Sequence, residues 1–137
     1  MNPLDKLSSL LKNQGYSVTR PRTVVFQVLI DAHDALTVAQ IIEKSSEVDM
    51  VSVYRTLQLF EKTGVAHRVW SGFKSKIELS EDFSPHHHHF TCSRCGSSVA
   101  IKSDELERSL HALETVYGFA LKQHSVELNG YCNKCQP

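Results

Sequence analysis

Residues 86–95 read His86-His-His-His-Phe-Thr-Cys-Ser-Arg-Cys95 and place six potential metal ligands within ten positions. A second cysteine pair, Cys132 and Cys135, stands near the end of the chain, and the two C-x-x-C pairs contain all four cysteines. This pattern is typical of a structural zinc site with four thiolate ligands, in which each pair forms a tight knuckle. The 36 residues between Cys95 and Cys132 would bring the second pair back to the first. The sequence therefore predicts Zn²⁺ bound by Cys92, Cys95, Cys132 and Cys135, with redox-active or chance pairs as the alternative.

The four histidines before the first knuckle need a separate interpretation. Phe90 and Thr91 favour extended backbone, and successive side chains of a β-strand point to opposite faces. A strand that begins near His86 would turn His86 and His88 to one face, and His87 and His89 to the other, so the run could supply two metal sites. Imidazole binds zinc, iron, nickel and copper, so the histidines do not identify the metal. An affinity tag or a surface cluster without a site is the alternative.

The overall composition indicates an ordinary globular protein. The chain has 137 residues, 41% hydrophobic and 22% charged, which suits one domain or two small ones. Fifteen basic residues balance fifteen acidic ones, so net charge gives no indication of nucleic-acid binding. No apolar run is long enough to span a membrane, and the N-terminus lacks the apolar core of a signal peptide. We expect a cytoplasmic location, where thiols stay reduced and favour metal over disulfide.

Helical spacing of apolar residues recurs through the first third of the chain. A first amphipathic helix ends at Gly15, and Thr19 and Thr37 are expected to be the N-caps of the next two helices. The apolar residues expected to be buried in the second helix are Val24, Val25, Val28, Leu29 and Ile30. Residues 52–64 predict a further helix, with Val53, Leu57 and Phe60 on its buried face and Gly64 just past its end.

Two short alternating runs follow, at residues 65–70 and 76–79, with residues 71–75 as the expected connection of a hairpin. Several small helices followed by a hairpin predict a winged helix-turn-helix, whose last helix enters the major groove of DNA. An ordinary small helical domain is the alternative. A polar stretch at residues 82–85, which contains Pro85, predicts a hinge. We therefore expect a winged-helix domain over residues 1–82 and a second domain over residues 83–137.

The second domain is expected to be a small α+β unit. A strand is predicted over residues 98–102, and Asp104 and Glu107 form a possible capping box. A helix follows, with an apolar stripe that runs from Leu106 to Tyr117 and ends at Gly118. A further strand is predicted over residues 119–128, immediately before the last knuckle. A unit of this size buries little apolar surface, so a zinc ion or dimerisation would have to stabilise it.

Taken together, the two halves resemble the ferric uptake regulator (Fur) family of bacterial metal-sensing repressors. The resemblance covers nearly the whole chain and is carried by five stretches: residues 11–16, 19–22, 52–57, 86–95 and 132–135. It implies an α+β fold with an N-terminal winged-helix DNA-binding domain, a hinge and a C-terminal α+β dimerisation domain that holds the Cys₄ zinc. It also implies a homodimer that binds double-stranded DNA at a palindromic operator.

The resemblance also assigns the remaining ligands. A second site within the dimerisation domain would use His86, His88, Glu107 and His124. The regulatory site would use His87 and His89, with Glu78 at the end of the wing, although Glu81 competes with Glu78. His67, on the first wing strand, would be the fourth regulatory ligand.

The fourth regulatory ligand distinguishes branches of the family. Iron and peroxide sensors of the family usually take a histidine from the loop before the third helix, often with an acid after the first knuckle. Here the loop offers His33 at a shifted position, and the acid position holds Ala100. Zinc uptake regulators use the position that His67 occupies, although Glu78 replaces the cysteine that many of them carry. Four nitrogen and oxygen ligands suit Zn²⁺.

The sequence thus predicts a metal-dependent transcriptional repressor of metal-uptake genes, most like the zinc uptake regulators. An iron, manganese or peroxide sensor of the same family is the alternative, with Fe²⁺ in place of regulatory Zn²⁺. Outside the family, the alternatives are a zinc-storage protein or a zinc enzyme, but a Cys₄ site lacks the open position that catalysis needs. The expected DNA contacts are Ser52, Tyr54, Arg55 and Thr56 on the recognition helix and, for the backbone, Lys12, Arg20 and Arg22.

Overall fold

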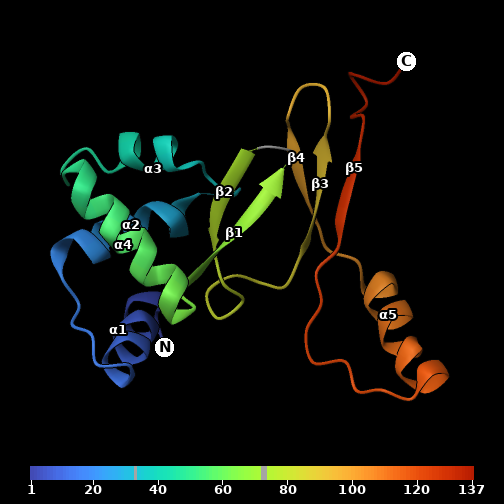
Figure 1. The fold of residues 1–137 in the computed structure, drawn as a ribbon, viewed down its shortest axis with the longest axis horizontal. Helices are drawn as coiled ribbons and strands as arrows, with labels where there is room; N and C mark the ends of the chain where they lie inside the picture. The colour runs from blue at the N-terminus through green and yellow to red at the C-terminus, as the bar shows by residue number, and fades with distance from the viewer. Residues whose placement is uncertain (33, 72–73) are drawn as a thin grey trace. The chain divides into compact units, whose positions relative to one another are not determined.

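The structure, a computed structural model, describes residues 1–32, 34–71 and 74–137. The chain forms two compact units, Met1–Pro85 and His86–Pro137 (Figure 1). The first unit contains four helices and a two-stranded sheet, and the second contains a three-stranded sheet and one helix. None of the helices in these ranges has the length and apolar character that a membrane crossing requires.

The helices of the first unit are α1 (Pro3–Asn13), α2 (Arg20–Asp31), α3 (Val38–Lys44) and α4 (Met50–Thr63). Local side-chain chemistry fixes several of their ends. Thr37 and Gln40 form a reciprocal capping box at the start of α3, and Gly64 ends α4 with a φ of 82°. Thr19 does occupy the N-cap position of α2, but its side chain makes no capping hydrogen bond.

The hairpin that follows α4 consists of β1 (Ala66–Ser71) and β2 (Lys74–Leu79) in antiparallel register. β1 has the predicted length but is shifted by one residue to include Ser71, and β2 is two residues longer than predicted because it includes Lys74 and Ser75 of the expected connection. The base of the hairpin is tied to the helices, because Leu36 and Ile77 exchange two backbone hydrogen bonds. This arrangement of helices and hairpin is the predicted winged helix-turn-helix.

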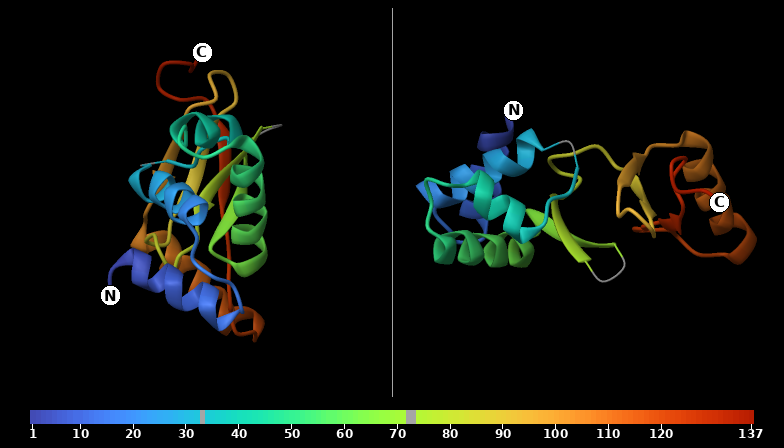
Figure 2. Two further views of the ribbon diagram at one scale, coloured as in Figure 1. Left: turned by 90° about the vertical axis from the view of Figure 1, so that its left-hand side faces the viewer. Right: turned by 90° about the horizontal axis from the view of Figure 1, so that it is seen from above.

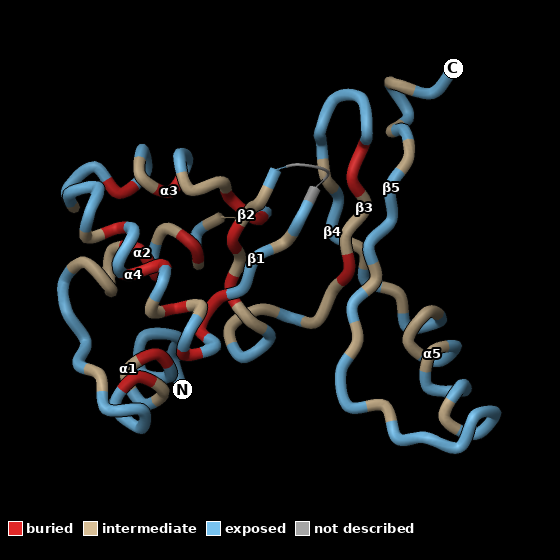
Figure 3. Tube along the Cα trace, in the orientation of Figure 1, coloured by how far each residue is buried: buried red, intermediate tan, exposed pale blue. Residues whose placement is uncertain are grey.

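The core of the first unit lies where the helices meet the hairpin (Figure 3). Its largest fully buried side chains include Phe26 and Phe60, whose rings meet edge to face with centroids 6.4 Å apart. Phe26 was not among the residues expected to be buried in α2, whereas Val24, Val28 and Ile30 are only partly buried. Phe83 packs its ring on Phe26 at 5.1 Å, so the segment after the hairpin is attached to this core.

The sheet of the second unit has the order β4-β3-β5, with β4 (Ser98–Ile101) antiparallel and β5 (Glu127–Gly130) parallel to the central β3 (His88–Cys92). This strand was expected to begin near His86, and it begins two residues later, at His88. The predicted strand over residues 119–128 was also wrong in extent, because only its last two residues belong to β5. Residues 119–126 form no regular element, and the carbonyl oxygen of Val126 accepts a hydrogen bond from His89 N.

Helix α5 (Asp104–Tyr117) starts one residue earlier than the predicted capping box requires. Ser103 is the N-cap, and its hydroxyl accepts a hydrogen bond from Leu106 N, so Asp104 is the first helical residue. The predicted pair of Asp104 and Glu107 is therefore wrong as a capping box. Because Ser103 already caps the helix, the carboxylate of Glu107 is available for other contacts.

The second unit, every residue of which is described, has almost no apolar core (Figure 3). Its buried residues are His88, Thr91 and Cys92, and none belongs to α5. The apolar stripe of α5 is largely open to solvent in the single chain, including Leu113 and Tyr117. Such a unit needs stabilisation from outside its own apolar packing.

Candidate metal centres and nucleic-acid interface

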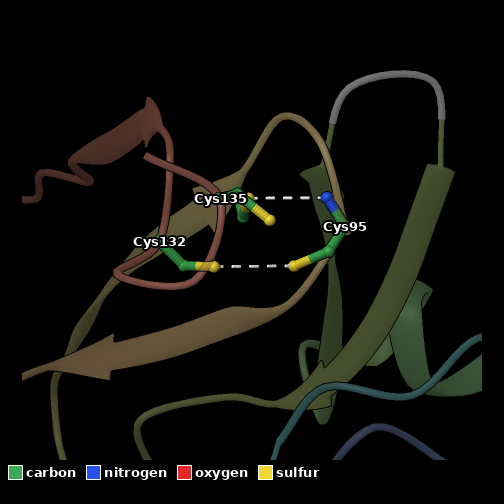
Figure 4. Close-up of side chains that lie close together, drawn as sticks. Cys95, Cys132 and Cys135 are labelled. Carbon is green, nitrogen blue, oxygen red and sulfur yellow. Dashed lines mark hydrogen bonds between the residues drawn. The ribbon is translucent and has the colours of Figure 1, made fainter. Parts of the chain in front are cut away.

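The four cysteines converge at the end of the second unit. Cys92 ends β3, Cys95 lies three residues further on, and Cys132 and Cys135 follow β5. Each Sγ lies within 4.8 Å of every other, and Figure 4 shows Cys95 and Cys132 facing each other with their sulfurs 3.8 Å apart. Parallel pairing of β3 with β5 produces this convergence, because it brings the two knuckles to the same end of the sheet. Four sulfurs at these separations fit a closed tetrahedral Zn²⁺ site.

The surroundings of the cysteines favour thiolate at one side of the cluster. Backbone hydrogen bonding from Cys132 and then Cys95 lowers the pKa of the Cys92 thiol to about 6. The hydroxyl of Ser97, 3.0 Å from Cys95 Sγ, lowers the pKa of that thiol. The neighbouring Cys132 raises the pKa of Cys135 to about 12. Four thiolates therefore cannot coexist here without a compensating cation, which is the charge that Zn²⁺ supplies.

Arg94 links the two knuckles. Its guanidinium donates a hydrogen bond to the carbonyl oxygen of Cys135 and lies 5.3 Å from the ring centroid of Tyr131. The first knuckle is thus bound to the residues that flank the second one, independently of the sulfurs. The positive charge also offsets part of the negative charge of a Cys₄ centre.

A second cluster contains His86, His88, Glu107 and His124, and one ligand atom of each lies within 4.8 Å of all the others. The carboxylate of Glu107 is its centre. Oε1 lies 2.6 Å from His88 Nε2 and 3.2 Å from His86 Nε2, and Oε2 lies 2.6 Å from His124 Nε2. β3 and the residues before it supply two of the histidines, and α5 supplies the carboxylate. Three imidazoles and a carboxylate are a donor set that Zn²⁺ or Fe²⁺ accepts.

Contacts with imidazole rings stabilise the charged form of the Glu107 carboxylate in this cluster. Burial alone would raise the pKa of Glu107, but the hydrogen bonds from His88 and His124 outweigh it and lower the pKa. His88 is fully buried, and its Nδ1 accepts a hydrogen bond from Val126 N at 3.1 Å. That bond fixes the ring orientation, so that Nε2 points at Glu107.

The four predicted regulatory ligands form one pair in each unit. In the first unit, His67 and Glu78 are register partners across the hairpin, with Nε2 and Oε1 3.0 Å apart. In the second unit, the rings of His87 and His89 meet with centroids 4.7 Å apart. Glu81 lies in the turn after β2 and is exposed. His33 lies outside the described residues.

The predicted DNA contacts gather at the starts of α2 and α4. A cavity of about 150 Å³ there is lined by Thr19, Pro21, Arg22, Ser52, Arg55 and Thr56. Tyr54 and Arg55 are exposed on α4, whereas Thr56 is only 4% exposed and lines the cavity from below. Two arginines and small hydroxyl side chains around a hollow of this size suit a phosphate group.

Three of the predicted DNA contacts also have partners within the chain. Arg20 forms an ion pair with Glu47 at 2.8 Å, and Arg22 donates to the carbonyl oxygen of Ser17. The Ser52 hydroxyl donates to Asp49, the N-cap of α4, at 2.7 Å. Lys12 is exposed in the last turn of α1.

Asp49 and Val126 are the residues that sequence reasoning missed. Asp49 is the N-cap of α4, and an aspartate immediately before a helical apolar pattern is a recognisable capping signal. Val126 acts through its backbone N–H, for which no sequence signal exists.

Comparison with known proteins agrees with this geometry. The family model of the ferric uptake regulator family matches residues 13–129. The ferric uptake regulation protein of Bacillus subtilis is 30% identical over 141 residues, which span 98% of this chain and 95% of that protein. The crystal structure of the Vibrio cholerae ferric uptake regulator has 27% identity and a TM-score of 0.73, with 92% of this chain and 99% of that chain covered. For the Pseudomonas aeruginosa ferric uptake regulator, solved with manganese, the values are 26% and 0.77, with 91% and 96% covered.

The family model spans most of the chain, and the relatives match it nearly end to end. The fold, with its N-terminal DNA-binding domain and C-terminal dimerisation domain, is that of the solved ferric uptake regulators. The chain therefore belongs to the ferric uptake regulator family and is a metal-responsive, DNA-binding transcriptional regulator rather than an enzyme.

Proposed function

We propose that this chain is a zinc-sensing repressor of metal-uptake genes, which acts in the cytoplasm as a homodimer on a palindromic operator. Residues 1–82 would form its DNA-binding domain, and residues 83–137 its dimerisation and metal-binding domain. The observation that carries the choice of zinc is the contact between His67 and Glu78 on the wing. This contact makes two of the four expected regulatory ligands neighbours.

The Cys₄ cluster would hold a permanent structural Zn²⁺. It joins the ends of β3 and β5 in a unit that has only three buried residues, so the metal would supply stability that apolar packing does not. The exposed stripe of α5 would be covered by the partner in the homodimer.

The regulatory metal would be held by His67, Glu78, His87 and His89. Because these ligands belong to two different domains, sharing one metal would restrict the segment at residues 82–85. The two recognition helices of a dimer must lie about one DNA turn, roughly 34 Å, apart to enter successive major grooves. Metal binding would then favour the arrangements that fit the operator, as a shift of population.

The second cluster, with His86, His88, Glu107 and His124, would adjust this response from within the dimerisation domain. Its ligands come from one unit and already lie together. Metal there would stabilise that unit and would set the metal threshold of repression.

On the DNA side, Arg55 and Tyr54 would read the major groove from α4. Arg22 and Arg55 would hold a backbone phosphate at the cavity between α2 and α4. Lys12 and Arg20 would position the backbone further out, and Arg20 would exchange its ion pair with Glu47 for a phosphate. Ser52 and Thr56 would contribute less, since one caps α4 and the other is buried.

Iron sensing is the second candidate, and the matched relatives named ferric uptake regulation protein favour it. The metal found in a solved structure does not decide the matter, because the Pseudomonas ferric uptake regulator was solved with manganese. Zinc also binds most nitrogen and oxygen sites more tightly than ferrous iron, so affinity alone cannot separate the two functions.

The test is operator binding under buffered Zn²⁺, Fe²⁺ and Mn²⁺, with duplexes that the metal-loaded protein selects from a random library. Wild type is compared with His67→Ala and His33→Ala. If the protein senses zinc, His67→Ala loses the response and His33→Ala keeps it. The reverse pattern assigns the protein to the iron-sensing branch.

A further inference from the structure

The one tryptophan of the chain, Trp70, stands largely in solvent on the hairpin of the first unit. It lies on β1 opposite Ser75, and 61% of its surface is exposed. The indole is the largest of the mainly apolar side chains, and most of its surface in Trp70 is not buried when the chain folds. An exposed tryptophan of this kind has most of its contact surface available for a partner.

The face of the hairpin that carries Trp70 is the one that turns toward the helices. Side chains alternate along a strand, so Trp70 shares its face with Arg68 and with Ala66, which is buried in the core. Arg68 Nε lies 3.1 Å from both carboxylate oxygens of Glu61 on α4, and its guanidinium also donates to Ser75 Oγ. These bonds fix the hairpin to α4.

Trp70 therefore continues the exposed surface of α4. Glu61 lies two helical turns beyond Tyr54 on α4, so the Glu61–Arg68 contact borders the side of the helix that carries Tyr54. The right-hand view of Figure 2 shows α4 and the hairpin extending along the same side of this unit. Lys74, the first residue of β2, is exposed at the same end of the hairpin, but its register partner is Ser71, so its side chain belongs to the opposite face from Trp70.

We propose that Trp70 is a DNA contact of the wing, which packs its ring on the sugar–phosphate backbone beside the major groove that α4 enters. The indole Nε1–H would donate to a phosphate oxygen. This inference rests on the proposed function and extends its DNA footprint from α4 to the wing.

Since Trp70 is the only tryptophan, its fluorescence reports this contact without any label. The full-length metal-loaded protein is titrated with the selected operator duplex, with a scrambled duplex of the same length, and with metal alone. Acrylamide quenching is measured at each end point. We expect the operator to reduce the quenching constant by about threefold or more, as burial of an exposed ring requires.

Two variants complete the experiment. Trp70→Ala should weaken operator affinity about tenfold, in the range found for aromatic contacts with nucleic acid, and Trp70→Phe should recover part of the loss. Leu4→Ala, which removes an exposed apolar side chain from α1, is the matched control and should bind like wild type. Circular dichroism and zinc content confirm that each variant is folded.

The outcomes separate this inference from the proposed function. Tight operator binding with an unchanged quenching constant, or with Trp70→Ala at full affinity, overturns the wing contact and leaves the repressor function in place. Protection of Trp70 by metal in the absence of DNA would also overturn it, because the ring would then be covered by protein. If no duplex is selected under any metal, both the proposed function and this contact are wrong.

Discussion

His67 Nε2 lies 3.0 Å from Glu78 Oε1, and the two residues are register partners on neighbouring strands of the wing. Both are held by the hairpin backbone, so their separation is set by the strand pairing rather than by a flexible loop. In the proposed regulatory site this histidine and carboxylate would supply two of the four ligands. The other two proposed ligands, His87 and His89, belong to the second unit and have their rings 4.7 Å apart.

This pairing predicts non-additive effects on metal-dependent DNA binding. His67→Ala and His87→Ala should each reduce the metal response of operator affinity by about tenfold or more, and the double variant should be little worse than either one. The reason is that removal of any one ligand already opens the shared site. Fluorescence anisotropy at buffered Zn²⁺ measures the operator affinity of wild type, of both single variants and of the double variant. Fully additive losses would show that the two histidines do not share a metal.

A second prediction concerns the cysteine cluster. Cys92→Ser should lose the tightly held zinc, about one ion per chain, and should leave the second unit unfolded or aggregated. Cys92 is buried at the end of β3, so the loss of zinc there removes the metal link between β3 and the second knuckle. Elemental analysis and size-exclusion chromatography are the measurements. A folded Cys92→Ser dimer without zinc would contradict a structural role.

The helices of this chain could be predicted from the sequence because their ends carry local signals. Thr37 with Gln40, Gly64 and Gly118 each satisfy free backbone groups of a helix within a few residues. The strands of the second unit were less predictable. The parallel pairing of β5 with β3 joins residues far apart in the sequence, and no local pattern determines where such a pairing starts.

In the candidate sites, too, features with a local sequence pattern could be predicted and features that depend on the fold could not. The ring of His86 contacts that of His88, and the ring of His87 contacts that of His89, which is the grouping that strand alternation predicted, although β3 begins only at His88. Glu107 entered the cluster through the family resemblance, whereas its local sequence suggested a capping box. The frame of that box could not be decided from sequence, because Ser103 and Asp104 are adjacent residues and both favour the N-cap position.

A third prediction tests the nucleic-acid interface. Arg55→Ala should weaken operator binding by about 1–3 kcal/mol, because it removes a guanidinium from both the exposed face of α4 and the cavity at its start. Zinc content and dimerisation should not change. A uniform loss across duplex sequences identifies a phosphate contact, and relaxed discrimination at one base pair identifies a base contact.

Arg20→Ala is the matched control for Arg55→Ala. It removes an equal charge, but one that is exposed and paired with Glu47. We expect a smaller loss of affinity and a smaller change in salt dependence. Equal losses for the two variants would mean that the starts of α2 and α4 contribute only general positive charge.

The last prediction concerns how the stability of the metal-free second unit changes in acid. The pKa of Glu107 is lowered from its ordinary value of 4.5. Its bonds to His88 and His124 therefore stabilise the folded unit at pH values above 4.5. This stabilisation is lost as the pH falls through the lowered pKa of Glu107. Glu107→Gln should therefore increase hydrogen exchange at the Val126 amide, which donates to His88 Nδ1, at neutral pH, and the difference from wild type should vanish in acid. Glu114→Gln is the matched control on the same helix, because Glu114 is paired with the exposed His111 and should leave this amide unchanged. Equal exchange rates for wild type and Glu107→Gln at neutral pH would show that the carboxylate does not organise the cluster.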